Sequence, residues 1–215
     1  MEEQAKNVST GHSAGSVSDN SPLKTSRGFS DVLSLLLVVV IAFSVALLLT
    51  AYIFQSYQVD GPSMEPTLQN SNRLIVWKLP RTLAHITGHA YIPDRGDIVI
   101  FNTNGLPDFG EDGKQLIKRV VALPGEQVVI KNGTLNVYNK QHPQGFSPDA
   151  TLPYGKAITS TQGDESITVP KNSIFVCGDN RGDSLDSRIF GPVPTTNIVG
   201  KLVFRVLPIN ELEGF

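Results

Sequence analysis

One uncharged apolar run, Val32–Phe54, constrains this chain more than any other feature of its sequence. As an α-helix the run would be roughly 34 Å long at about 1.5 Å per residue, which is enough to cross a bilayer. A core helix of this length would normally carry a polar face, and the apolar core of a signal peptide is shorter and ends at a small-residue cleavage site. The run instead ends in Tyr52-Ile53-Phe54, whose aromatic residues suit a membrane interface. We therefore expect a transmembrane helix over residues 32–54.

The basic residues on either side of this run predict its direction. Lys24 and Arg27 precede it closely, and the next basic residue is Arg73. The positive-inside rule then places residues 1–31 in the cytoplasm and residues 55–215 on the other side of the membrane. Residues 1–31 are rich in Ser, Gly and Asn and lack apolar periodicity, which predicts a disordered cytoplasmic tail.

Beyond the run, the apolar pattern changes to the period of β-strands. Gly (19) and Pro (14) are plentiful, which favours many short strands and turns. Asn132-Gly133 lies between two alternating segments and predicts a tight hairpin. The fold class that follows is mainly β, with an antiparallel, barrel-like body. We expect residues 139–168, which are polar, to form a loop or a small inserted β subdomain. The predicted strands are Ser56–Val59, Arg73–Lys78, Asp97–Phe101, Gln115–Ala122, Gln127–Lys131, Thr134–Tyr138, Ser173–Cys177 and Val199–Val206.

Composition disfavours several classes of protein. The formal net charge is −2 with 18% charged residues, so nothing indicates a basic surface for nucleic acid. Cys177 is the single cysteine and lies in an apolar strand, which favours a buried structural thiol over a nucleophile. His85 and His89 are four residues apart but lack the glutamate of the H-E-x-x-H zinc motif, so a surface pair is favoured over a metal site.

Ser63 lies in the stiff segment Asp60-Gly61-Pro62-Ser63-Met64-Glu65-Pro66. Pro62 fixes its own φ angle and Pro66 restricts the residue before it, so the serine is held in a defined position. The α/β-hydrolase motif G-x-S-x-G is not met, because Glu65 stands at its last position. Taken alone, this segment is more typical of an ordinary turn.

Lys118 lies within the apolar strand predicted over residues 115–122. If its neighbour Arg119 faces solvent, Lys118 faces the core, because side chains alternate along a strand. Burial would lower the pKa of the amine from roughly 10.4 and allow it to act as a base. A lysine on an edge strand, facing water, is the alternative.

The polar stretch Gly178–Arg188 does not fit a calcium loop, because Arg181 stands where a ligand is required and Phe190 where the loop needs Glu.

Four ordered blocks behind the apolar run give the sequence its resemblance. They are residues 63–68 (SMEPTL), 95–101 (RGDIVIF), 118–125 (KRVVALPG) and 178–188 (GDNRGDSLDSR). Together they resemble bacterial type I signal peptidases, the membrane-bound Ser-Lys endopeptidases that remove signal peptides. The resemblance extends from about residue 32 to residue 206.

The resemblance implies a role for each matching residue. Ser63 corresponds to the nucleophile, Lys118 to the general base, and Ser184 to the hydroxyl that orients the lysine amine. Asp186 and Arg188 correspond to a structural ion pair beneath the site. The implied fold is a β-rich catalytic core whose apolar surface touches the membrane, and the implied chemistry needs no metal or cofactor.

Substrate binding is also implied by the resemblance. Some family members carry a serine where this chain has Gly61, so the oxyanion hole would use the Ser63 backbone N–H and a second donor in the Gly61 region. The family accepts small residues at the −1 and −3 positions, typically Ala-x-Ala. The residues that by position could line such pockets are Val59, Met64, Leu68, Leu74 and Ile117.

The expected protein is therefore a single-pass enzyme of the bacterial cytoplasmic membrane. Its expected partners are the signal peptides of exported preproteins and the lipid bilayer. The sequence leaves the oligomeric state open. A self-cleaving regulator of the same clan is disfavoured because such proteins lack an anchor. A membrane-tethered, non-catalytic β-domain that binds partners stays as the alternative, and it would tolerate loss of Ser63 and Lys118.

Overall fold

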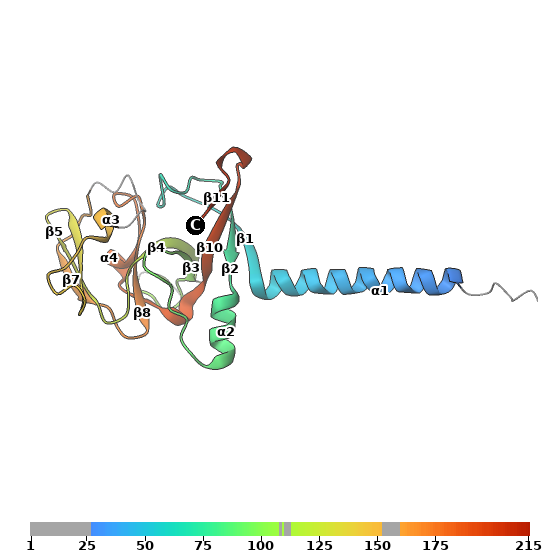
Figure 1. The fold of residues 1–215 in the computed structure, drawn as a ribbon. Coiled ribbons are helices and arrows are strands. Elements are labelled where there is room, and N and C mark those ends of the chain that lie inside the picture. The colour runs from blue at the N-terminus through green and yellow to red at the C-terminus, as the bar shows by residue number, and fades with distance from the viewer. Residues whose placement is uncertain (1–26, 108, 110–112, 152–159) are drawn as a thin grey trace, which may run out of the picture. The chain divides into compact units, whose positions relative to one another are not determined.

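The computed structural model describes residues 27–107, 109, 113–151 and 160–215. The chain divides into two units, Met1–Phe43 and Ser44–Phe215. Helix α1 (Arg27–Leu48) begins in the first unit and continues as a π-helical turn, Leu49–Ile53 (Figure 1). Its segment Ser30–Leu48 is long and apolar enough to cross a membrane. Most of the predicted tail lies outside the described residues, and residues 27–31 already belong to the helix.

The second unit is built on an eight-stranded antiparallel sheet. Its strands follow the order β1-β2-β10-β3-β4-β8-β9, with β11 paired to β10. This confirms the expected mainly β, antiparallel fold. Within the described residues β1 pairs only with β2, and β9 only with β8, so the sheet has two ends. The strands are β1 (Phe54–Gln58), β2 (Arg73–Trp77), β3 (Ile98–Asn102), β4 (Gln115–Ala122), β8 (Ser173–Cys177), β9 (Val193–Pro194), β10 (Ile198–Leu207) and β11 (Glu213–Gly214).

A smaller sheet has the order β6-β5-β7, from β5 (Gln127–Lys131), β6 (Thr134–Tyr138) and β7 (Glu165–Thr168). Asn132 and Gly133 have φ angles of 50° and 76°, the positive values that a two-residue hairpin turn requires. The hairpin predicted at this dipeptide is confirmed. Strand β7 and the short helix α3 (Pro148–Thr151) fall within the segment predicted as an insertion.

Strands β4 and β8 are buried on both faces. Val120 and Val176 pack into one apolar cluster, whereas the adjacent residues Val121 and Phe175 pack into a second cluster with the smaller sheet. Cys177 is fully buried in this second cluster, as expected, and burial raises the pKa of its thiol. Because both faces are covered, alternation along β4 does not separate core from solvent.

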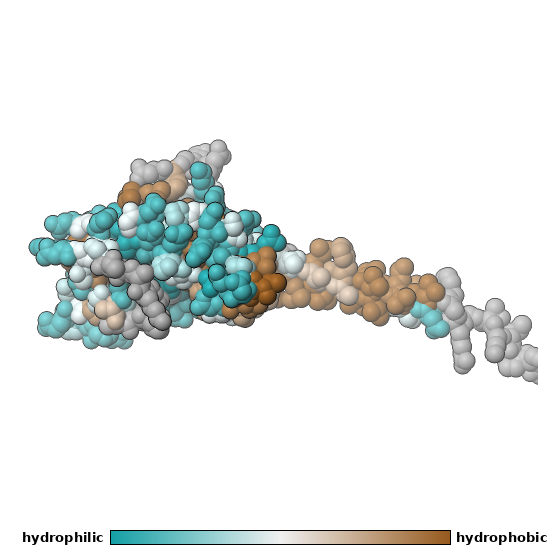
Figure 2. All heavy atoms as spheres, turned by 90° about the horizontal axis from the view of Figure 1, so that it is seen from above, coloured by the Kyte–Doolittle hydropathy of each residue, from teal (hydrophilic) through white to brown (hydrophobic). Residues whose placement is uncertain are grey.

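Helical segments occupy the connections. They are α2 (Leu79–Thr87), α4 (Ser187–Phe190) and two 3₁₀ turns, Thr195–Asn197 and Ile209–Glu211. In the space-filling view, apolar residues cover α1 along its length, whereas polar residues dominate the visible face of the second unit (Figure 2).

Candidate active site

The loop that carries Ser63 is anchored by its own side chains. Met64 and Leu68 are fully buried beside Leu74, and the Leu68 N–H donates to the Met64 carbonyl at 2.9 Å. Gly61 has a φ of 97°, a conformation that other residues rarely adopt, and its N–H donates to Asn70 Oδ1 at 3.1 Å. Packing on one side thus leaves Ser63, which is half-buried, in a fixed position.

Strand β4 brings Lys118 to this serine. Lys118 Nζ donates to Ser63 Oγ at 2.7 Å and to the Ile117 carbonyl at 2.9 Å. The lysine is only 3% exposed. Burial lowers the pKa of its amine to about 8, against the opposing charges of Asp186 and Asp179. Two residues that are far apart in the sequence therefore form a buried amine–hydroxyl pair.

Arg119 is buried and does not face solvent, so the condition from which the burial of Lys118 was argued is not met. Both side chains are buried because β4 lies between β3 and β8 with both faces covered. Its Nε and Nη2 donate to the two carboxylate oxygens of Asp179 at 2.8 Å and 2.6 Å. Asp179 Oδ2 also accepts from Thr67 Oγ1 at 2.5 Å. This ion pair was not predicted from the sequence. It connects β4, through Asp179 and Thr67, to the loop that carries Ser63.

The stretch Gly178–Arg188 holds the same loop from another side. The Asn180 N–H donates to the Ser63 carbonyl at 3.1 Å, and Asn180 Nδ2 donates to the Pro62 carbonyl at 3.3 Å. A Cβ atom on Gly178 would collide with the Ser63 carbonyl oxygen and with the side chain of Ser184. Glycine is therefore required where the two loops approach each other.

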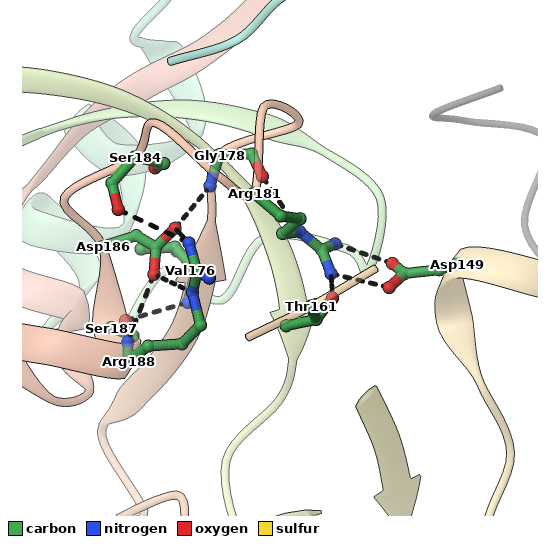
Figure 3. A network of polar contacts seen from close by, with 9 residues as sticks. All are labelled: Asp149, Thr161, Val176, Gly178, Arg181, Ser184, Asp186, Ser187 and Arg188. Atoms are coloured by element: carbon green, nitrogen blue, oxygen red, sulfur yellow. Dashed lines mark hydrogen bonds and ion pairs between the residues drawn. The ribbon is translucent and has the colours of Figure 1, made fainter. Parts of the chain in front are cut away.

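Asp186 and Arg188 form an ion pair in this stretch (Figure 3). Arg188 Nε and Nη2 each donate to one carboxylate oxygen at 2.8 Å. Asp186 is fully buried and accepts from the Gly178 N–H at 3.0 Å, and its side chain caps α4 by accepting from the Arg188 N–H. The carboxylate thus fixes the end of β8 relative to the start of α4.

Ser184 lies against Gly178, but its Oγ is buried and has no hydrogen-bond partner among the described residues. Its carbonyl accepts from Arg188 Nη2 at 3.4 Å. The structure therefore shows no hydrogen bond from Ser184 Oγ to Lys118 within the described part of the chain, and the orienting role of this hydroxyl stays a prediction.

Arg181 links the same stretch to the insertion (Figure 3). Its Nη1 and Nη2 donate to the carboxylate of Asp149 at 2.6 Å and 2.7 Å, and its Nε donates to the Gly178 carbonyl at 3.0 Å. Thr161 Oγ1 also accepts from Nη1. The only sequence signal for this contact is the position of Arg181 inside the fourth block, since Asp149 lies in a segment without a recognisable pattern.

A cleft of about 120 Å³ opens beside Ser63 and Lys118. Three of the predicted pocket residues, Val59, Leu74 and Ile117, line it. Met64 and Leu68 do not, because their side chains are buried in the core beneath the loop. The other lining residues, which sequence reasoning missed, are Tyr57, Gln58, Asp60, Ile100, Gln115 and Leu116.

The backbone donors near Ser63 differ in availability. The Ser63 N–H donates no hydrogen bond to any residue within the described ranges. The Gly61 N–H, by contrast, already donates to Asn70 Oδ1. Of the two predicted oxyanion donors, only the serine N–H is therefore unoccupied.

Comparison with known proteins gives a consistent result. Residues 32–207 match the family model described as signal peptidase, peptidase S26. A signal peptidase I from Bacillus caldolyticus is 36% identical over 80% of this chain and 89% of its own length. A signal peptidase IB from Staphylococcus aureus strain COL is 30% identical over 85% of this chain and 93% of its own. A crystal structure of a signal peptidase I from Enterococcus faecalis V583 is 31% identical, with a TM-score of 0.39, over 52% of this chain and 97% of that one. Because the family model covers most of the sequence and the curated relatives match over nearly their whole length, this chain belongs to the signal peptidase family of serine peptidases, peptidase S26.

Proposed function

We propose that this chain is a membrane-tethered endopeptidase that removes N-terminal signal peptides from exported preproteins, using Ser63 and Lys118 as a catalytic dyad. The observation that carries the proposal is the 2.7 Å contact between Lys118 Nζ and Ser63 Oγ, made by a lysine that is 3% exposed. The names of the relatives, signal peptidase I and IB, support the substrate class.

The lowered pKa of Lys118 supports its role as the base. With a pKa of about 8, a substantial fraction of the amine is neutral under mildly alkaline conditions. The neutral amine then accepts the Ser63 proton while Oγ attacks the scissile carbonyl carbon, and an acyl-enzyme ester forms as the C–N bond breaks. The ammonium gives its proton to the leaving amine. Neutral again, Lys118 takes a proton from the water that attacks the ester, and it returns this proton to Ser63 Oγ as the C–O bond of the ester breaks.

The negative charge that develops on the substrate carbonyl oxygen during the reaction needs a hydrogen-bond donor next to Ser63. The Ser63 N–H is the donor we propose, since it has no partner among the described residues. Asn180, which donates to the Ser63 carbonyl, supports the orientation of that peptide unit. The second donor predicted in the Gly61 region is not the Gly61 N–H in this arrangement, because Asn70 Oδ1 accepts it.

The small cleft supports a preference for small side chains. Its volume of about 120 Å³ and its apolar wall of Val59, Leu74 and Ile117 suit the methyl groups of an Ala-x-Ala sequence. Larger side chains at the −1 position would have to displace residues that pack into the buried core. We therefore propose cleavage after small residues.

Helix α1 supports the membrane tether. Its apolar side chains from Val32 to Leu48 are exposed rather than packed into the protein. Together with Lys24 and Arg27 before the span, this supports one pass through the bacterial cytoplasmic membrane, with the N-terminus in the cytoplasm and residues 55–215 outside.

Mapping the cleavage of a precursor that contains Ala-x-Ala tests this function. The purified full chain should release a mature protein whose N-terminus follows the second alanine, as read by mass spectrometry. Ser63→Ala should release none, and Lys171→Ala, at an exposed lysine, should behave as the wild type. Unchanged cleavage by Ser63→Ala would overturn the mechanism, and no cleavage by any variant would favour a non-catalytic binding domain.

A further inference from the structure

Helix α2 is a surface element that the catalytic site does not use. Pro80 lies in its first turn, where no backbone N–H is needed. The helix ends at Thr87 and is capped by Gly88, which has a φ of 70° and donates its N–H to the Ala84 carbonyl. None of its residues is buried. Ile86 is 75% exposed and Leu83 is 51% exposed. The helix therefore presents apolar side chains outward without a described partner for them.

Hydrogen bonds fix α2 to the residues that follow the apolar span. The Lys78 N–H donates to the Ile53 carbonyl at 2.7 Å, and Thr82 Oγ1 donates to the Tyr52 carbonyl at 3.2 Å. The span ends at Leu48, a single turn before Tyr52. The start of α2 is thus held where the chain would leave a membrane.

A pocket of about 480 Å³ lies at this junction, lined by Tyr52, Lys78, Arg81, Thr82, His85 and Ile86. None of the residues described as lining it is acidic. The Arg81 side chain makes no hydrogen bond or ion pair with any residue in the described ranges. Positions 78, 81, 82 and 85 fall on one side of a helix with 3.6 residues per turn, and Ile86 adjoins them. The pocket therefore combines basic groups with an apolar edge.

We propose that this pocket binds the phosphate group of an anionic phospholipid. Arg81 would contact the phosphate, because a guanidinium suits phosphate geometry. Lys78, whose Nζ donates to Gln55 Oε1 at 3.1 Å, would add a second positive charge beside it. Ile86, which lines the edge of the pocket, would enter the boundary between headgroups and acyl chains, as apolar side chains of surface-bound helices do. The inference rests on the membrane tether proposed above. An acidic soluble peptide is a weaker fit, because it would leave Ile86, which is 75% exposed, in water.

Lipid retention by the full chain tests the site. Wild type, Arg81→Glu and Lys171→Glu are each placed in nanodiscs of phosphatidylcholine with added phosphatidylglycerol, and native mass spectrometry measures the phosphatidylglycerol that stays bound. Lys171 matches Arg81 in the size of its charge reversal but is exposed before β8, outside the pocket. Arg81→Glu should lower phosphatidylglycerol occupancy by about tenfold, with Lys171→Glu unchanged. Equal retention by Arg81→Glu and wild type would overturn the site, as would an equal loss in Lys171→Glu.

A second measurement reports how deeply position 86 lies in the membrane, rather than the effect of charge on lipid binding. A fluorophore on Ile86→Cys should be quenched by spin-labelled lipid, and the same fluorophore on Lys171→Cys should not be. The native thiol, Cys177, is fully buried, so labelling is confined to the introduced cysteine. An unquenched label at position 86 would contradict the proposal. Precursor binding could also be weakened in Arg81→Glu to the same extent with and without phosphatidylglycerol. That result would contradict the proposal and would indicate that the pocket binds an acidic peptide. A wild-type chain that failed to enter the discs would overturn the tether, whereas a chain that enters without these effects would overturn only the pocket.

Discussion

The two neighbouring positions Lys118 and Arg119 on strand β4 place buried cations in opposite surroundings. Arg119 has a carboxylate partner, Asp179, at 2.6 Å. Among the described residues, the Lys118 amine hydrogen-bonds only to a hydroxyl and a carbonyl, at 2.7 Å and 2.9 Å. Burial without a contacting carboxylate lowers the pKa of the lysine to about 8. One strand thus supplies both a charged structural residue and an amine that loses its proton at mildly alkaline pH. The two residues are similarly buried and differ in their partners.

Removing the amine should have the largest effect. Lys118→Met keeps an unbranched side chain but leaves Ser63 without a base, so kcat/KM should fall by about 10³-fold or more, measured on an Ala-x-Ala precursor. The thermal midpoint should not fall, because a buried amine is replaced by an apolar group. Lys118→Arg sharpens the result, since a guanidinium cannot lose its proton and should be equally inactive. Activity near the wild-type value in either variant would contradict the assignment.

Removing the other cation should damage stability instead. Arg119→Met leaves the buried carboxylate of Asp179 without its partner, which should cost about 3–5 kcal/mol of unfolding free energy. Denaturant titration measures this loss. The double variant with Asp179→Asn removes the unpaired charge and should recover part of it. A cost below about 1 kcal/mol for Arg119→Met would mean that the pair contributes little.

A smaller effect is expected at Ser184. Ser184→Ala removes a hydroxyl that has no hydrogen-bond partner among the described residues, so the free energy of unfolding should hardly change. If the hydroxyl orients the Lys118 amine during the reaction, kcat/KM should still fall by about tenfold or more. Parallel measurements of kinetics and unfolding separate the two effects. Unchanged kinetics would remove Ser184 from the site.

The last effect concerns the pH dependence of stability. The pKa of Lys118 is about 8 in the folded chain, below its ordinary value of 10.5, so the folded state binds fewer protons between these pH values. Stability should therefore rise from pH 8 to pH 10.5, and this contribution should be lost as the pH falls through 8. The thermal midpoint of the wild type, relative to Lys118→Met, should rise by about 5–10 °C over that window. A constant difference would contradict a lowered pKa.

Much of the fold was predictable from local pattern. The main strands, the Asn132-Gly133 hairpin and the burial of Cys177 follow from alternation, turn chemistry and composition. Helix α2 was missed, because its segment is short and exposed and its apolar residues do not pack into the core.

The site was less accessible to such reasoning. Ser63 and Lys118 each had an ordinary interpretation, and only the four ordered blocks suggested that they meet. The burial of Lys118 was argued from alternation on the condition that Arg119 faces solvent, whereas both residues are buried because β4 is covered on both faces. The contact of Arg181 with Asp149 depends on how a long connection folds back, which no local pattern predicts.

A chemical change at the base itself tests the central claim most directly. Lys118→Cys can be alkylated with 2-bromoethylamine, which restores an amine of nearly the same length with a sulfur atom in its chain. Cys177 is fully buried, and wild type treated with the same reagent controls for its reaction. The sulfur withdraws electrons and lowers the pKa of the amine. We predict that activity returns and that the acidic limb of the kcat/KM profile, near pH 8 in the wild type, moves to lower pH. A limb that stays at the wild-type position would show that another group titrates, and Lys118 would not be the base.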